Sequence, residues 1–324
     1  MISRRLLRIK TLKLLYGHAP SASASIVIEP IEKELQTSIQ KLYDLFHFIL
    51  SSATHVADYA EERINIGMQK FRPTDKEAHP NRRFVENALI GLLRRNRPLA
   101  QYCKKHSLSW TRDTTKSIRD IYTNMIERDY YKTYMANPEK ASFYDDRLFL
   151  QRFFRYEFEG NEPLETMLEE QSMWWCTDDL GYVLGVIIRT LAEFKPEQPD
   201  DTPLSGAQRS RVEKDFARRL LRRSLTHYQE YWNMAVPFLK NWEADRVATM
   251  DMMLIVQGFA EAVEFPEMPV RVTLNEHVEL AKYYSTHNSY IFVNGVLDRM
   301  IKQGLADGLI VKKGIARGGY LKPA

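Results

Sequence analysis

Cysteine is scarce in this chain of 324 residues, which has only Cys103 and Cys176, neither of them part of a CxxC pair. A disulfide framework and a cysteine-based zinc site are therefore excluded, and the composition fits a reducing, cytoplasmic setting. Long apolar runs are also missing, because the longest candidate, around residues 180–191, is shorter than the ~20 residues of a membrane span. The N-terminus is basic, but its bases interrupt the apolar residues, so we expect no secretory signal.

Catalytic motifs are absent as well: the sequence has no HExxH, GxGxxG, Walker-type loop, GxSxG or paired Cys/His ligand set. His277 is the most tempting base, since Glu276 and Glu279 are close to it in sequence. Residues at i−1 and i+2 do not share a helix face, however, so we expect a surface histidine. The two cysteines are expected to be inert thiols. The sequence predicts a protein that is not an enzyme, with no catalytic residue, metal site or cofactor.

Signals for β-strands are few. There is no sustained period-2 alternation, and the one Asn-Gly pair, Asn294-Gly295, lies inside a helical pattern. Apolar residues instead recur at helical spacing, which makes all-α the predicted fold class. The expected helices cover residues 2–17, 31–68, 82–95, 110–136, 208–239 and 247–263.

Positive charge is local rather than general, because the net charge is only +4. The first predicted helix has five bases and no acid, and Arg4, Arg5 and Arg8 fall within roughly a 100° arc of it. This arc is either a solvated helix end or a phosphate-binding face. A further basic cluster, at residues 94–105, has the same two interpretations, and the arginines of residues 218–223 form one basic helix face.

The charge is inverted in one stretch, since no Lys or Arg occurs between Arg155 and Arg189 while eight acids do. Phosphate would be repelled here, so this acidic stretch is not expected to bind RNA. It either docks on a basic face of the same chain, receives a basic protein partner, or presents its acids to water with Trp174 and Trp175 in the core.

Residues 270–299 predict two short helices joined by a polar turn. Thr273 followed by Glu276 has the form of a capping box for the first helix. Ser289 is a plausible cap for the second, and Gly304 offers it a left-handed stop.

The same stretch also resembles a known family. The segments 275–276 (NE), 278–282 (VELAK) and above all 292–298 (FVNGVLD) are similar to the C-terminal end of the NusB family of transcription antitermination factors. The N-terminus agrees, because family members begin with an Arg-rich helix that ends in an aliphatic-Leu-Tyr sequence, here residues 14–16. Residues 238–251 resemble the family's central helices.

The resemblance implies a NusB-like helical bundle of two small subdomains with an additional helical insertion, similar to the long form found in the Bacteroides group. Residues 195–205, with three prolines, are the clearest linker. The expected organisation is an Arg-rich first helix of the core at 1–19, the insertion at 20–205, the rest of the core at 206–304 and a basic tail at 305–324.

The resemblance also implies a non-catalytic function: binding of boxA-type single-stranded RNA together with NusE, a protein of the small ribosomal subunit, in an RNA polymerase antitermination complex. Phe292 is contested, because its helical spacing indicates the core while the family suggests a base contact. This chain also departs from the family, with Asn288 in place of an acid and with Val256 and Ala260 in place of an Arg and a Tyr. The implied RNA-binding residues are Arg4, Arg5, Arg8, Asn288, Ser289 and Phe292, and the implied partner-binding residues are Tyr16 and Asp251.

Two other functions are compatible with parts of the sequence. The chain could be a helical protein–protein scaffold of the transcription or ribosome-assembly machinery without RNA binding of its own, as the acidic stretch suggests. NusB-like domains also occur fused ahead of rRNA methyltransferases. No Gly-rich cofactor loop or catalytic cysteine motif follows here, which argues against that third function.

Overall fold

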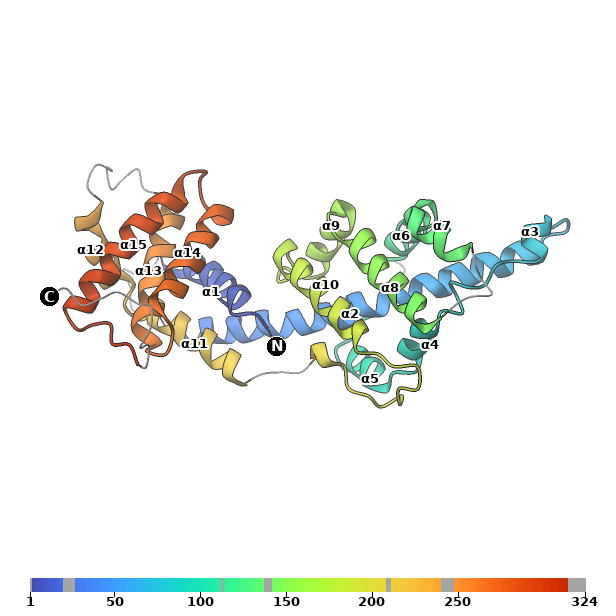
Figure 1. The fold of residues 1–324 in the computed structure, drawn as a ribbon, viewed down its shortest axis with the longest axis horizontal. Coiled ribbons are helices and arrows are strands. Elements are labelled where there is room, and N and C mark those ends of the chain that lie inside the picture. Colours follow the sequence, from blue (N-terminus) through green and yellow to red (C-terminus); the bar gives the residue numbers. More distant parts are fainter. Residues whose placement is uncertain are drawn as a thin grey trace. The chain divides into compact units, whose positions relative to one another are not determined.

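A computed structural model describes residues 2–19, 27–111, 114–136, 142–207, 211–239 and 248–313. Every regular element in these ranges is a helix, so the all-α prediction is confirmed (Figure 1). Contacts between Cα atoms divide the chain into two compact units. Unit 1 comprises residues 1–38 and 210–324, and unit 2 comprises residues 39–209. The domain boundaries inferred from the sequence, at 19/20 and 205/206, remain predictions.

Unit 1 is built around one helix, α13, in which all residues from Asp251 to Ala262 are buried. A helix that is buried all round needs neighbours on every side. Helices α1, α11, α12, α14 and α15 supply them, and they surround α13 in Figure 1. The helices of unit 1 are α1 (Arg4–His18), the start of α2 (Ile28–Met68), α11 (Arg211–Thr226), α12 (Tyr228–Ala235), η5 (Val236–Phe238), α13 (Thr249–Glu264), α14 (Val270–Tyr284) and α15 (Ser289–Ala306).

Two glycines permit close packing around α13. A Cβ atom added to Gly258 would lie 2.6 Å from Leu297 Cδ2, so only glycine allows α15 to approach α13 here. Gly304 plays the same part from α15, since a Cβ there would lie 3.0 Å from the ring of Phe259. The predicted stop at Gly304 is therefore wrong: α15 continues to Ala306, and Gly308 has the positive φ, +74°.

The predicted helix caps are also wrong. Helix α14 begins at Val270 after Pro269, so Thr273 lies one turn inside it with its hydroxyl buried against Glu261. The N-cap of α15 is Asn288, and the Ser289 hydroxyl donates to Asp251 instead of capping the helix. In both places a buried carboxylate on α13 engages the hydroxyl that the local pattern assigned to a cap.

Residues 208–239 do not form the single helix that their pattern predicts. Helix α11 ends at Thr226, His227 lies outside the helical region, and α12 begins at Tyr228. The break allows Tyr231 to pack edge-on against Phe259 of α13, with ring centroids 4.9 Å apart. Tertiary packing here overrides a continuous amphipathic pattern.

Unit 2 contains the rest of α2 and a set of shorter helices grouped around α8, which contacts α4, α6, α7 and α10 (Figure 1). Two tryptophans, Trp110 and Trp175, stack on Phe48 of α2 with centroid distances of 4.3 and 5.3 Å. Of the two tryptophans that one interpretation of the acidic stretch placed in the core, Trp175 is buried and Trp174 is half-buried. The helices after α2 are α3 (Asp75–Ala78), α4 (Ala88–Arg95), α5 (Arg97–Lys105), α6 (Thr115–Glu127), α7 (Asp129–Met135), α8 (Phe143–Phe158), α9 (Glu162–Gln171), α10 (Thr177–Ala192) and η4 (Ser205–Ala207).

The close approach at Gly258 predicts a contrast between two glycine substitutions in helices. Gly258→Ala should destabilise the protein by about 1–3 kcal/mol, because Leu297 must move out of a packed core. Gly295→Ala, in α15, should stabilise it by about 0.5–1 kcal/mol, because a Cβ there meets no described atom within 4 Å. Urea unfolding of the two variants checks this, and equal effects of the same sign would contradict the packing at Gly258.

Candidate nucleic-acid interface

The three arginines of α1 lie in different environments although they share one arc of the helix. Ser3 caps the helix by accepting a hydrogen bond from Leu6 N, and no acid is present in the first turn. Arg4 and Arg5 are exposed, whereas the Arg8 side chain is only 3% exposed. The arc is therefore divided: its outer part faces solvent, and its inner part enters the core of unit 1.

Arg8 forms a buried ion pair with Glu261 of α13. Its Nε and Nη2 atoms donate to the two carboxylate oxygens at 2.6 and 2.9 Å, and its Nη1 reaches Glu276 of α14 at 3.3 Å. The Thr273 hydroxyl donates a further hydrogen bond to Glu261 at 2.8 Å. A bidentate pair with additional donors satisfies a charge that would otherwise be costly to bury. This cluster joins α1, α13 and α14.

His277 belongs to the same cluster and is fully buried, so the prediction of a surface histidine is wrong. Its Nδ1 lies 2.8 Å from the Thr273 carbonyl oxygen, which can only accept, so Nδ1 carries the proton. Burial lowers the pKa of His277. Burial acts to raise the pKa of Glu261, but the hydrogen bond from Arg8 and the positive charge of its guanidinium act against burial, and the net shift is downward. At neutral pH Glu261 is therefore ionised against Arg8, while His277 stays neutral.

The turn between α14 and α15 is held from inside by Asp251 of α13. Its carboxylate accepts hydrogen bonds from the hydroxyls of Ser285 and Ser289, the latter at 2.8 Å. Asp251 and Ser289 are both buried, and Phe292 is only 8% exposed, while Asn288 lies at the surface. Of the three residues implied to bind RNA at this turn, the structure therefore presents Asn288 to solvent and places Ser289 and Phe292 inside.

Two aromatic side chains lie beside this turn, the exposed Tyr283 and the half-buried Tyr290, and the sequence-based prediction did not include them. Tyr283, at the end of α14, is 78% exposed, and the ammonium group of Lys282 lies 5.6 Å from the ring centroid of Tyr290. The hydrogen bond that Arg5 donates to Glu276 raises the pKa of Arg5 and joins α1 to α14, the helix that also carries Lys282 and Tyr283. We call these four residues, Arg5, Lys282, Tyr283 and Tyr290, the α1–α14 face.

The signal that could have found this face is the run Lys282-Tyr283-Tyr284 directly before the polar turn, with Tyr290 directly after it. Basic side chains interleaved with aromatic ones suit single-stranded nucleic acid, because the basic groups contact phosphates and the aromatic rings stack on nucleobases. Lys13 adds to this arrangement from α1, with its ammonium group 5.8 Å from the ring centroid of Tyr284.

Two carboxylates moderate the charge of the α1–α14 face. Glu276 accepts two hydrogen bonds from Arg5, each of 3.0 Å, and Glu279 pairs with Lys282. A phosphate must compete with these exposed ion pairs, which are individually weak in water. The face therefore favours modest, salt-dependent binding over tight binding.

The residues implied to contact a protein partner are also divided. Tyr16 is half-exposed near the end of α1, whereas Asp251 is buried under the turn. Val256 and Ala260, which depart from the family pattern, have no exposed surface. Their substitution therefore changes the packing around α13 and does not directly change a surface.

Arginines of the basic clusters at residues 94–105 and 218–223 form ion pairs with acids. Arg94, Arg95 and Arg97 pair with Asp58, Asp200 and Asp201, respectively, and the last two acids belong to the predicted linker. In α11, Arg219 pairs with Glu264 and Arg222 with Glu32. This arrangement favours the interpretation of both clusters as solvated faces.

In the described ranges, no three His, Cys, Asp or Glu side chains are placed to hold a metal ion. No helix in the same ranges has the length and apolar character needed to cross a membrane.

The buried pair predicts a large difference between two Glu→Gln substitutions. Glu261→Gln should destabilise the protein by about 3–5 kcal/mol, because it leaves the Arg8 guanidinium buried without a full counter-charge. Glu279→Gln, which removes an exposed carboxylate, should unfold close to the parent. Chemical unfolding measures both, and a mild effect of Glu261→Gln would show that the pair is solvated.

His277 predicts a pH dependence of stability. Its pKa is lowered in the folded state, so below the ordinary value of about 6.5 the unfolded chain binds a proton that the folded chain does not. Stability should fall with pH from 7.5 to 5.5, by at most about 1.4 kcal/mol per pH unit for this one group. His277→Gln should reduce this fall in stability between pH 7.5 and 5.5, as measured by chemical unfolding at each pH. Identical pH profiles of stability for the variant and the parent would contradict this role of His277.

Comparison with known proteins agrees with this geometry. Residues 190–302 match the model of the NusB family, a range that includes α13, α14 and most of α15. No solved structure matches the chain.

Several curated proteins named transcription antitermination protein NusB are similar to the chain. The protein of Salinibacter ruber is 36% identical over 31% of this chain and 63% of its own length. That of Methylacidiphilum infernorum is 34% identical over 28% of this chain and 63% of its own length. That of Chloroherpeton thalassium is 33% identical over 31% of this chain and 48% of its own length. The chain thus spans less than two thirds of each of these relatives, and it contains a NusB-family domain at residues 190–302, preceded by a long N-terminal extension.

Proposed function

We propose that this protein is a non-catalytic, cytoplasmic transcription antitermination factor that binds boxA-type single-stranded RNA together with the ribosomal protein NusE, in an RNA polymerase antitermination complex. The observation that carries the proposal is the α1–α14 face, which belongs to the same unit as the NusB-family domain's central helix. The names of the similar proteins support the proposal.

In this proposal, the surface side chains of the α1–α14 face contact different parts of the RNA. Arg4, Arg5 and Lys282 neutralise phosphates at the surface, and Tyr283 and Tyr290 offer rings on which unstacked bases lie. Asn288 adds hydrogen-bonding groups at the exposed turn.

The remaining residues implied by the family act from beneath this surface in our proposal. Arg8 fixes α1 against α13 through Glu261, so that Arg4 and Arg5 stay aligned with α14. Ser289 holds the turn on Asp251, and Phe292 anchors the first turn of α15 in the core. They position the RNA-binding groups and do not themselves need to reach RNA.

The ion pairs of Arg5 with Glu276 and of Lys282 with Glu279 limit the RNA affinity of the protein alone, so NusE would be needed to raise it. Because phosphate must displace two carboxylates, RNA affinity of the protein alone is expected to be moderate. A partner bound nearby, at the half-exposed Tyr16, would add contacts to the same RNA and raise the affinity.

The ion pairs of Arg5 and Lys282 with acids of α14 favour a second candidate function. If the carboxylates keep Arg5 and Lys282 occupied, the domain is a protein–protein scaffold that has lost RNA binding. Such a scaffold binds the ribosomal protein without any effect of RNA.

RNA binding predicts distinct effects for two substitutions on the face. Tyr283→Ala should weaken binding of a boxA-like oligonucleotide about tenfold, through loss of one stacked base. Arg5→Ala should reduce the salt slope of log affinity, expected near −3 for about four phosphates, by about 0.7. Fluorescence anisotropy with and without NusE measures both.

The controls for this experiment are a scrambled RNA and Arg218→Ala, which removes an exposed base from α11. Arg218→Ala should leave both the affinity and the salt slope unchanged. The scaffold function is favoured instead if NusE binds and the boxA-like and scrambled RNAs behave alike.

A further inference from the structure

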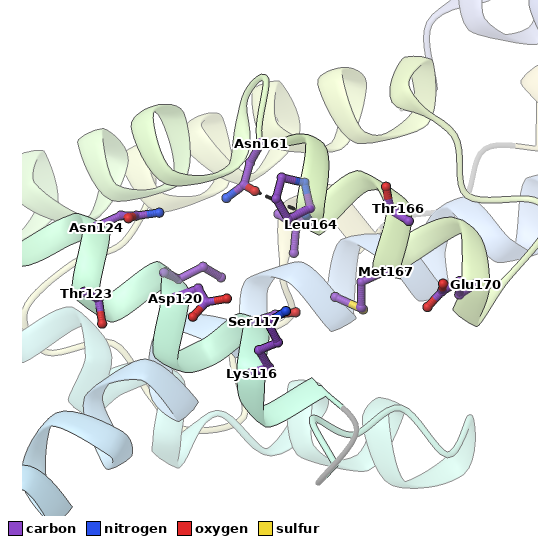
Figure 2. Close-up of a pocket in the computed structure, with 12 residues that line it drawn as sticks. Lys116, Ser117, Asp120, Thr123, Asn124, Asn161, Leu164, Thr166, Met167 and Glu170 are labelled. Atoms are coloured by element: carbon purple, nitrogen blue, oxygen red, sulfur yellow. Dashed lines mark hydrogen bonds between the residues drawn. The ribbon is translucent and has the colours of Figure 1, made fainter.

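Unit 2 contains a groove between α6 and α9, with a cavity volume of about 470 Å³ (Figure 2). One face of each helix lines it, at positions spaced by three or four residues, as helical periodicity requires. Ile121 and Leu164 form a buried apolar floor, and Met167 extends from α9 toward α6. The groove is thus shaped to accept apolar side chains presented by one face of a partner helix.

The rim of the groove is acidic on its α9 side. Glu170 lines the groove, and Glu162 and Glu169 are exposed on the same helix, which contains no base. Across the groove, Lys116 and Asp120 of α6 carry opposite charges and cancel. The net field at the rim is therefore negative, which attracts cations and repels nucleic acid.

The acids at the end of α9 interact unfavourably with the dipole of their own helix. The C-terminus of a helix has a negative partial charge, so Glu169 and Glu170 in the last turn of α9 are in an unfavourable position. No base is present in that turn to offset them. A cationic side chain from outside the chain would relieve this repulsion, which makes binding a natural source of stabilisation for this end of the helix.

An exposed apolar residue follows the acids directly. Met173 is 84% exposed, just beyond the end of α9, and its flexible thioether is suited to surfaces that adapt to a partner. Negative charge and apolar side chains thus occur together on α9 and just beyond its end.

We propose that the α6–α9 groove binds a basic amphipathic helix of a partner protein, whose apolar face enters the groove and whose Lys or Arg side chains meet the rim of α9. Charge complementarity selects this occupant, because an RNA or an acidic peptide would be repelled by the same rim. The proposal does not depend on RNA binding by unit 1.

A pair of model peptides tests the proposal on the full chain. We expect a helical Leu/Lys amphipathic peptide to bind saturably by fluorescence anisotropy, and a Leu/Glu peptide of the same length not to bind. Glu169→Gln combined with Glu170→Gln should weaken binding about fourfold, since each exposed pair contributes a factor of about two. The matched control, Glu193→Gln with Glu197→Gln, alters exposed acids elsewhere in unit 2 and should bind like the parent.

A second variant separates docking in the groove from general attraction. Thr166 is exposed and lines the groove, so Thr166→Trp should fill it without changing charge or the core, and should abolish saturable binding. Circular dichroism of each variant should match the parent.

Three results would overturn the proposal. They are absence of saturable binding by the Leu/Lys peptide, equal binding of the two peptides, and unchanged binding by Thr166→Trp. Concentration-dependent self-association that Thr166→Trp abolishes would instead assign the groove to a second copy of this chain.

Discussion

The ion pair between Arg8 and Glu261 is the interaction on which the rest of unit 1 depends. It is enclosed by α1, α13 and α14, and its groups are satisfied by Thr273 and Glu276. Burying two charges is costly unless their geometry is close to ideal, so each helix must occupy one position relative to the others. An apolar contact at the same place would tolerate sliding, whereas a bidentate pair does not. The conformation of α1 is thereby tied to the centre of the bundle.

This constraint links the core to the surface. Because Arg8 is held, Arg5 one turn earlier emerges next to Glu276 of α14, and the α1–α14 face has a definite shape. A second buried carboxylate, Asp251, does the same for the turn before α15. Buried acids on α13 therefore position two surfaces that, in our proposal, bind RNA, without any of these acids being exposed to it.

Unit 2 uses its charges differently. Its arginines at 94, 95 and 97 are neutralised by acids of the same unit, two of them in the linker region. The acids of α9 have no comparable partners among the described residues, and they lie beside an apolar groove. The two units thus present different surfaces: unit 1 presents basic side chains with aromatics, and unit 2 presents acids beside an apolar floor.

The sequence by itself determined the all-helical class, the family resemblance and the scarcity of local cues for catalysis, because periodicity and short motifs are local properties. It could not determine the exposure of charged residues within one helical arc, and so Arg8 and His277 were expected at the surface. Thr273, Ser289 and Gly304 look like caps and stops in the sequence, yet each is used for packing against α13. Only the tertiary structure decided these roles, because a buried carboxylate or a close helix approach depends on residues more than ten positions away. The α1–α14 face was missed for the same reason: Arg5 meets Glu276 of α14 only after the chain has folded.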